Sequence, residues 1–287
     1  MNKQQKSTAF CFLVFPLLML LIFTYFPFVK VIFNSFFSMS YTKNQGFVLF
    51  NNYIEVFINR DFNKAITVSV YYMLAAVVQV TVSLLLSLIL SKCRFHTIYK
   101  MIFVLPYMIN GIAIGYIFKM FYSHGYVLDS ILSFFGANVD MLPYWLRDQD
   151  INNWALAFSS VWRYSGLSLV VFLGAIGSIE HSLFEASSLD GANRMKQIKY
   201  IVWPSIQRVF NLTLILSIVT SLSEFELPYA IASGGANGTA TYMTLIYHIA
   251  FTERKIGLAS AMAVVLLIQL TLFTSILLSI ANTFRDE

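Results

Sequence analysis

The sequence predicts an all-α membrane protein with six transmembrane helices, and three observations support this class. Of the 287 residues, 58% are hydrophobic and only 11% are charged, whereas soluble domains carry roughly 25% charged residues. Six long apolar stretches fill the chain, and most of the connections between them are short. Each stretch is close to the length of about 20 residues that a helix needs to cross the hydrocarbon core. We therefore expect a single transmembrane domain over residues 1–287.

Each helix is placed on its apolar run. The first, second and sixth contain uncharged runs of 23, 27 and 29 residues, and the third contains one of 18. The fourth run is interrupted only by Arg163, and the fifth carries Glu224 and Glu226 near its end. The six helices are expected at about 7–37, 65–91, 101–121, 152–179, 206–228 and 256–284.

The orientation follows from the distribution of Lys and Arg, because short cytoplasmic loops carry an excess of these residues. One side, which includes both chain ends, carries ten basic residues, and the other carries seven over much longer loops. The long loop from Phe121 to Asn153 is acidic as well. We therefore expect both termini in the cytoplasm. The two cysteines, Cys11 and Cys93, fall at cytoplasmic helix ends, which argues against a disulfide framework.

The cytoplasmic loop at about 180–205 predicts two short helices joined by a tight turn. Ser182 and Glu185 have the spacing of a capping box, which would start a helix at about Leu183. Three apolar residues then recur on one face of that helix: Leu183, Ala186 and Leu189. Asp190-Gly191 ends the helix, since glycine takes the left-handed conformation at little cost.

The second short helix is expected to begin at Asn193, which can cap it, and to stop at Pro204. Its apolar face consists of Met195, Ile198 and Ile201 or Val202. We call this predicted helix pair, residues 180–205, the knuckle. Its exposed apolar face needs a cover, which can be anionic lipid headgroups or the groove of a partner protein.

The residue order within the knuckle resembles the EAA motif of ABC importer permeases, which reads E-A-A, three residues, G, nine residues, I, one residue, L-P. The matching positions, together with the residue before the glycine, are Glu185, Ala186, Ser187, Asp190, Gly191, Ile201 and Pro204. Ser187 stands for the second alanine, and Trp203 stands for the leucine. The resemblance implies that the knuckle is the coupling helix that docks on a cytoplasmic ATPase.

Other stretches resemble the maltose-permease-like carbohydrate branch of this family, among them Asn51-Asn52-Tyr53, Leu105-Pro106 and Ser233-Gly234-Gly235-Ala236. The resemblance implies the type I importer (MetI-like) transmembrane fold and a passive permease subunit in a bacterial inner membrane. It also implies a second homologous permease subunit in a heterodimer, a cytoplasmic ATPase dimer, an extracytoplasmic solute-binding protein, a carbohydrate substrate and surrounding membrane lipid. We expect no catalytic residue, metal, cofactor or nucleic-acid partner.

Arg163, Glu224 and Glu226 are candidates for the translocation path. Arg163 lies 17 residues before Glu180, so about 25 Å above the inner face of the membrane. A charge at that depth usually faces a cavity or a partner, although it can also snorkel to the interface or pair structurally. Because Glu224 and Glu226 are two residues apart, they cannot share a helical face. One can therefore face the path and the other the binding protein or water, unless both are simply exposed at a helix end.

Two other functional classes compete with a permease subunit. A channel or ion-coupled transporter is disfavoured because the sequence shows no internal repeat and no intramembrane acid pair. An intramembrane enzyme is disfavoured because no nucleophile or metal motif is evident.

Overall fold

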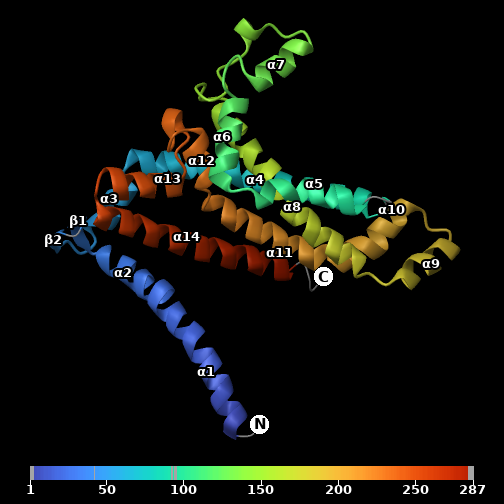
Figure 1. Ribbon diagram of the computed structural model, residues 1–287, viewed down its shortest axis with the longest axis horizontal. Coiled ribbons are helices and arrows are strands. Elements are labelled where there is room, and N and C mark those ends of the chain that lie inside the picture. Colours follow the sequence, from blue (N-terminus) through green and yellow to red (C-terminus); the bar gives the residue numbers. More distant parts are fainter. Residues whose placement is uncertain (1–2, 42, 92, 94–95, 284–287) are drawn as a thin grey trace. The chain divides into compact units, whose positions relative to one another are not determined.

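The computed structural model describes residues 3–41, 43–91, 93 and 96–283, and nearly all of its regular structure is helical (Figure 1). The chain divides into two compact units. Unit 1 comprises Met1–Phe62 and Ile246–Gln269, and unit 2 comprises Asn63–Leu245 and Leu270–Glu287. Lys92, Arg94 and Arg285, which contribute to the charge bias used for orientation, lie outside the described residues, as does the side chain of Cys11.

Unit 1 begins with a long apolar span built from α1 (Lys3–Leu20), a π-helical turn (Leu21–Tyr25) and α2 (Phe26–Asn34). The span was expected to reach residue 37, but it ends at Asn34. The remaining elements of unit 1 are β1 (Phe37–Ser40), β2 (Lys43–Phe47), α3 (Asn51–Ile58), a π-helical turn (His248–Thr252) and the first half of α14 (Ile256–Thr283). The two strands pair antiparallel.

Asn52 explains why the first span ends early. Its Nδ2 donates to the backbone oxygens of Ser35 at 2.8 Å and of Phe37 at 3.0 Å. The adjacent Tyr53 hydroxyl lies 2.6 Å from that of Ser35. These contacts satisfy backbone groups that a continuing helix would otherwise pair. A Cβ at Gly257 of α14 would overlap the Phe37 carbonyl, so glycine allows that helix to pass closely.

Unit 2 contains the other membrane-spanning helices. They are α4 (Arg60–Leu90), α5 (His96–Met108), α6 (Gly111–Phe121), α8 (Asn152–Gly177) and α11 (Trp203–Leu222), with the second half of α14. Within the described residues, five spans are long and apolar enough to cross a membrane, and counting the bent pair α5–α6 as one more gives six. The predicted all-α, multi-span class is therefore confirmed. The first residues of α4 belong to unit 1, and that helix starts five residues before the predicted Ala65 because the Asn59 side chain caps it.

The prediction of a continuous third helix at 101–121 is wrong. α5 and α6 are bent by 96° at the break between Met108 and Gly111. Asn110 in this break has extended backbone angles, and its Oδ1 accepts the N–H of Ile112 at 2.9 Å and of Ala113 at 3.4 Å. The side-chain cap starts a new helix in a new direction, which an apolar run alone does not reveal.

The predicted fifth helix at 206–228 also differs from the structure at both ends. Pro204 does not stop the preceding helix, because α10 (Arg194–Gln197) continues through a π-helical turn (Ile198–Val202) into α11. The N–H of Trp203 bonds to the carbonyl of Ile198, so the wider turn precedes the proline, which lacks a donor of its own. At the other end, α11 stops at Leu222, and α12 (Glu226–Ile231) follows after a break.

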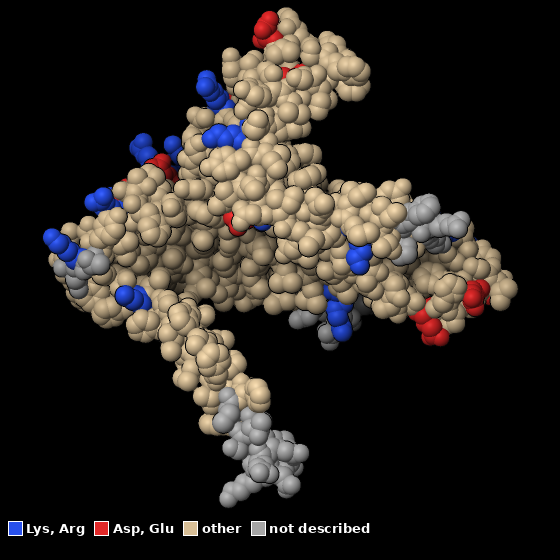
Figure 2. Space-filling view, in the orientation of Figure 1, with Lys and Arg blue, Asp and Glu red and all other residues tan. Residues whose placement is uncertain are grey.

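The shorter elements of unit 2 connect these spans. They are α7 (Val127–Phe134), a 3₁₀ turn (Val139–Met141), α9 (His181–Leu189), a 3₁₀ turn (Ala236–Gly238) and most of α13 (Tyr242–Tyr247). Figure 1 shows α9 and α10 at one end of this unit, and α6 and α7 at the other. Figure 2 shows a largely uncharged surface over α4, α5, α8 and α11, with acidic side chains gathered over the α9 end.

Candidate functional site

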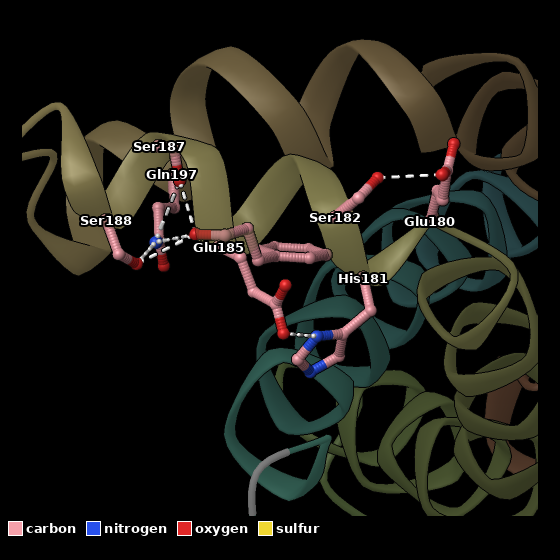
Figure 3. Close-up of polar contacts among 8 residues, drawn as sticks. Glu180, His181, Ser182, Glu185, Ser187, Ser188 and Gln197 are labelled. Atoms are coloured by element: carbon pink, nitrogen blue, oxygen red, sulfur yellow. Dashed lines mark hydrogen bonds and ion pairs between the residues drawn. The ribbon is translucent and has the colours of Figure 1, made fainter.

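The knuckle begins earlier than its sequence pattern suggested. α9 starts at His181, with Glu180 as the N-cap residue and no side-chain cap. Ser182 therefore lies inside the first turn, where its hydroxyl donates to Glu180 Oε1 at 2.7 Å. Glu185 Oε1 instead lies 3.1 Å from His181 Nδ1 (Figure 3). The predicted capping box between Ser182 and Glu185 is wrong, because a serine within the helix cannot act as the cap.

The turn between the two helices of the knuckle matches the prediction. Gly191 has a φ of +76°, in the left-handed region. Its N–H bonds to the Ser188 carbonyl at 3.1 Å, and the next N–H, of Ala192, bonds to Ser187 at 2.9 Å. Asp190 is the C-cap residue of α9. The Asn193 side chain accepts the N–H of Lys196 at 3.0 Å, so it caps α10 as expected.

A buried glutamine that the sequence patterns did not indicate fixes α9 against α10. Gln197 Nε2 lies 3.0 Å from the hydroxyl oxygens of both Ser187 and Ser188 (Figure 3), and 3.4 Å from the Phe184 carbonyl. The Phe184 ring packs against the apolar cluster around Phe172. The side of α9 that faces the body of unit 2 thus carries Phe184 and the serine pair.

The opposite side of the knuckle is apolar and uncovered. Leu183 is 49% exposed, Met195 is 74% exposed and Leu189 is 90% exposed. Ala186 is exposed as well. Of the last two motif residues, Ile201 is half-buried and Pro204 is exposed. A groove of about 860 Å³ lies beside this surface, between α9, α10 and the ends of α4 and α8. Large apolar side chains exposed in this way mark a surface that binds something.

The three candidate path residues meet in one network, in which Arg163 and Glu224 are buried. Arg163 of α8 is only 8% exposed, and its Nη1 lies 2.6 Å from Glu226 Oε2. The same nitrogen donates to the hydroxyl of the adjacent Tyr164 at 3.1 Å. That hydroxyl in turn donates to Glu224 Oε2 at 3.0 Å. We call Arg163, Tyr164, Glu224 and Glu226 the charged network. Arg163 is thus paired internally and does not snorkel.

The break after α11 explains how both glutamates reach the same network. Glu224 lies within the break and is only 6% exposed, whereas Glu226 is the first residue of α12, and its side chain is 42% exposed. The two residues do not share a helical face, as expected, but they no longer belong to one helix. The Thr241 hydroxyl donates to the Glu224 backbone carbonyl at 2.8 Å, and this bond holds the break in place.

Gly111 leaves the space in which the ion pair forms. A Cβ at this position would overlap the side chains of both Arg163 and Glu226. Four residues later, a Cβ at Gly115 would overlap Ala230 of α12. The two glycines therefore allow α6 to pack closely on α12 and to enclose the network.

A cavity of about 410 Å³ adjoins the network between α4, α8 and α11. Tyr164 and Glu224 belong to its wall, and so do four hydroxyl side chains of α11: Thr213, Ser217, Thr220 and Ser221. Gln79 of α4 crosses to α8, where it donates to the Ser168 hydroxyl at 2.7 Å. Thr213, Thr220 and Ser221 donate to backbone carbonyls of their own helix, so the wall of the cavity is mainly apolar. Among the described residues, no group of three or more His, Cys, Asp or Glu side chains is arranged to hold a metal ion.

Five helices that can span a membrane, and a bent pair that can form a sixth span among the described residues, define a multi-pass membrane protein with an exposed helix pair at one end. Residues 92–284 match the family model described as the binding-protein-dependent transport system inner membrane component, and the chain belongs to this family. The comparisons therefore confirm the family that the EAA-like pattern indicated. Members of this family are permease components, so the chain is a transport subunit and not an enzyme.

Individual relatives agree with this assignment. The chain is 29% identical over 295 residues to the "Probable ABC transporter permease protein YurN" of Bacillus subtilis, with 100% of each chain covered. It is 26% identical to the multiple sugar-binding transport system permease protein MsmF of Streptococcus mutans, covering 98% of this chain and 97% of that one. Its fold matches a chain of the bacterial alginate ABC transporter solved in complex with an alginate pentasaccharide-bound periplasmic protein. That match has a TM-score of 0.84 and 20% identity, and it covers 96% of this chain and 93% of the other.

Proposed function

We propose that this chain is one permease subunit of an ATP-driven carbohydrate importer. It forms half of the translocation path, and a second, homologous permease subunit forms the other half. A cytoplasmic ATPase dimer supplies the energy, and an extracytoplasmic solute-binding protein delivers the sugar. Membership of the binding-protein-dependent transport family supports the general scheme. The sugar transport system to which MsmF belongs supports the choice of substrate class.

The observation that carries the proposal is the exposed apolar face of the knuckle, in a segment with the EAA pattern. Leu183 and Leu189 lie between two candidate spans, Met195 lies at the start of the second, and none of the three is covered within the described part of the chain. A short helix with such a face can seat in a groove of a partner protein. We assign that groove to the ATPase, with Glu185, Ala186, Ser187, Asp190, Gly191, Ile201 and Pro204 as the coupling residues.

The continuity of α10 with α11 suggests how coupling works. Gln197 and Phe184 hold α9 on α10, and α10 runs without a break into α11 up to Leu222. From Arg194 to Leu222 this rod is about 43 Å long at 1.5 Å per residue. It ends directly before Glu224 of the charged network. When the ATPase dimer closes, the rod transmits the movement of the knuckle as a rigid body to the break between α11 and α12.

The charged network is the part of the path that we expect to respond to that movement. Arg163, Glu224 and Glu226 join α8 to the two sides of the break, so a shift of α11 changes their geometry. The partly exposed Glu226 is the member that can meet passing substrate or water.

The test is reconstitution of the chain with its partners in lipid vesicles. We expect a cytoplasmic ATPase and a second permease to co-purify with it. We also expect the vesicles to accumulate at least one member of a sugar panel only when ATP and the binding protein are supplied. Uptake by this chain alone, driven by an ion gradient, would instead establish a free-standing transporter and overturn the proposal.

The proposed orientation places both termini and the knuckle in the cytoplasm. A reporter fused after Lys43 or Asp148 should then be external, and one fused after Arg94 or Lys196 should be cytoplasmic. The reversed pattern would put the knuckle on the side without ATP, and the coupling role would fail with it.

A further inference from the structure

A third pocket lies in the part of unit 2 that carries α6 and α7. Figure 1 shows these two helices away from α9 and α10 of the knuckle. The volume of the pocket is about 470 Å³, and its walls are the end of α6, the loop residues 122–124 and 144–147, and the turn at 231–237. It includes no residue of the charged network and none from the cavity between α4, α8 and α11. We call it the outer pocket. Figure 2 shows basic side chains where α6 meets the loop that carries α7.

The outer pocket is lined by two basic side chains, Lys119 and Arg147. Lys119 Nζ donates to the Ser233 hydroxyl at 3.1 Å, which leaves two of its three donor positions unused. The guanidinium of Arg147 lies over the Tyr144 ring, 5.7 Å from its centroid. Within the described part of the chain this guanidinium makes no hydrogen bond or ion pair, and no acidic side chain lines the pocket. Such a site fits the oxygen atoms of an anion.

Asp129, the buried acid of this loop, already accepts hydrogen bonds from residues that form or adjoin the wall of the pocket. Asp129 is fully buried, and its carboxylate accepts the N–H of Gly125 at 2.7 Å and the Nε1–H of Trp145 at 2.7 Å. It also lies 3.1 Å from His124 Nδ1. These three contacts fix the loop between α6 and α8, so the positions of Tyr144 and Arg147 are set before any ligand arrives.

The opposite wall is a strained turn held from two directions. Ser233 and Asn237 both have a positive φ, of 52° and 57°, although neither is a glycine. Asn237 Nδ2 donates to the Leu146 carbonyl at 3.1 Å, and Asn152 Nδ2 donates to the Asn237 carbonyl at 2.9 Å. Left-handed non-glycine residues that the surroundings hold in place are found preferentially at functional sites.

The same loop also exposes large apolar side chains outside the membrane spans. Phe134 is 86% exposed, Phe135 is 81% exposed and Met141 is 83% exposed. A loop that carries a cationic pocket and also exposes aromatic residues is a surface for a protein, because a free sugar or a small anion would not cover those residues.

We propose that the outer pocket receives a carboxylate side chain of the solute-binding protein and thereby sets its position on the permease. The inference rests on the proposed function, since it names a docking contact for the partner that delivers the sugar. The acidic side chain would accept hydrogen bonds from Lys119 and Arg147 while Phe134 and Phe135 cover apolar surface beside it. The similar alginate transporter was solved with its periplasmic protein bound, which shows that a chain of this fold can carry such a partner.

The experiment uses the complete transporter in vesicles and titrates the binding protein while ATP hydrolysis is measured. In the Lys119→Glu/Arg147→Glu variant we expect the concentration for half-maximal stimulation to rise about tenfold or more. The maximal rate at saturating binding protein should stay unchanged, because the ATPase contact is untouched. Added salt should weaken docking in the wild type and have less effect in the variant. Lys43→Glu, at an exposed position of β2, is the matched control and should behave as the wild type.

An unchanged half-maximal concentration in the double variant would overturn the proposal. It would also be overturned if docking persisted and only the uptake of acidic sugars changed, because the pocket would then act on the cargo. If the double variant does not assemble, the same titration is made with Arg147→Glu alone and judged by the same two outcomes. The wild-type Arg147 side chain makes no hydrogen bond within the described residues, so its loss should not disturb assembly. A wild-type complex with no ATP-driven sugar uptake would refute the proposed function, whatever the variant does.

Discussion

The knuckle and the charged network break opposite rules of membrane-protein structure. The knuckle leaves Leu189 almost fully exposed outside the spans, where apolar side chains are normally covered. The network buries Arg163 and Glu224 within the spans, where charges are costly. The apolar face of the knuckle has no cover within the described residues, whereas the network pairs Arg163 with Glu226 inside the chain. Changes in the knuckle should therefore affect coupling, and changes in the network should first affect stability.

The two regions are joined by the continuous helix from Arg194 to Leu222. The two ends of this helix are held by different kinds of contact. Gln197 ties the knuckle end with a few hydrogen bonds, while Glu224 follows the other end within an ion-pair network. This helix can transmit movement only if α9 stays attached to α10 at one end and the charged network stays intact at the other.

The largest effect is expected from Arg163→Ala. Removing the guanidinium leaves Glu224 buried and Glu226 without its partner, although water offsets part of this cost because the Glu226 side chain is 42% exposed. The unfolding temperature of the purified complex in detergent should fall, and its yield should fall with it. An unchanged melting temperature would show that the network does not stabilise the fold.

The double variant Arg163→Met/Glu226→Gln separates stability from transport. It removes both charges of the pair, so it should regain much of the stability that Arg163→Ala loses. If uptake also returns, the pair has only a structural role. If assembly returns and uptake does not, the pair acts in the path itself.

The next largest effect is expected from Gly191→Val. A β-branched residue at a φ of +76° costs on the order of 1–3 kcal/mol, and the helices of the knuckle would then meet at a different angle. Uptake should fall tenfold or more while the chain still inserts into the membrane. Gly174→Val is the matched control, because Gly174 has a helical backbone and open space around its Cβ position. Equal uptake in both variants would contradict the role of the turn.

A smaller effect is expected from Gln197→Ala. The change removes hydrogen bonds to the hydroxyls of Ser187 and Ser188, each worth about 0.5–1.5 kcal/mol. α9 should loosen from α10, so ATP hydrolysis should continue with fewer sugars imported per ATP. The ratio of uptake to hydrolysis is the measurement, and Ser178→Ala, which removes only a local bond near the end of α8, is the control. A ratio that stays constant would mean that the tether is dispensable.

The coarse architecture was predictable from the sequence, because a helix that crosses lipid needs a long apolar run. Long apolar runs located the six spans, and the spacing around Gly191 located the turn of the knuckle, since a left-handed position favours glycine. Hydropathy did not predict the break at Asn110, because the residues on both sides are apolar, and the two glutamates near the end of the fifth run did not show that a separate short helix follows. Each break depends on one polar side chain or on a contact with a distant segment.

The site was predictable only in part, for a related reason. Arg163, Glu224 and Glu226 stood out as charges in apolar stretches, but Tyr164, which bridges them, did not. A tyrosine directly beside an intramembrane arginine is a signal that could have indicated it. Gln197 was missed because its partners on α9 are ten and nine residues away, beyond any helical period. The capping box failed because α9 starts at His181, which puts Ser182 inside the first turn.

The central claim is that the exposed face of the knuckle binds the ATPase, and Leu189→Asp tests it most directly. The side chain is 90% exposed and contributes little to folding, so the variant should melt at the wild-type temperature. Phe135→Asp, at an 81% exposed position on the opposite end of unit 2, is the control. We expect the affinity of the ATPase for vesicles with the Leu189→Asp permease to fall about tenfold, or about 1.4 kcal/mol, with no change in the control. Equal ATPase affinity in the wild type and in both variants would contradict the account.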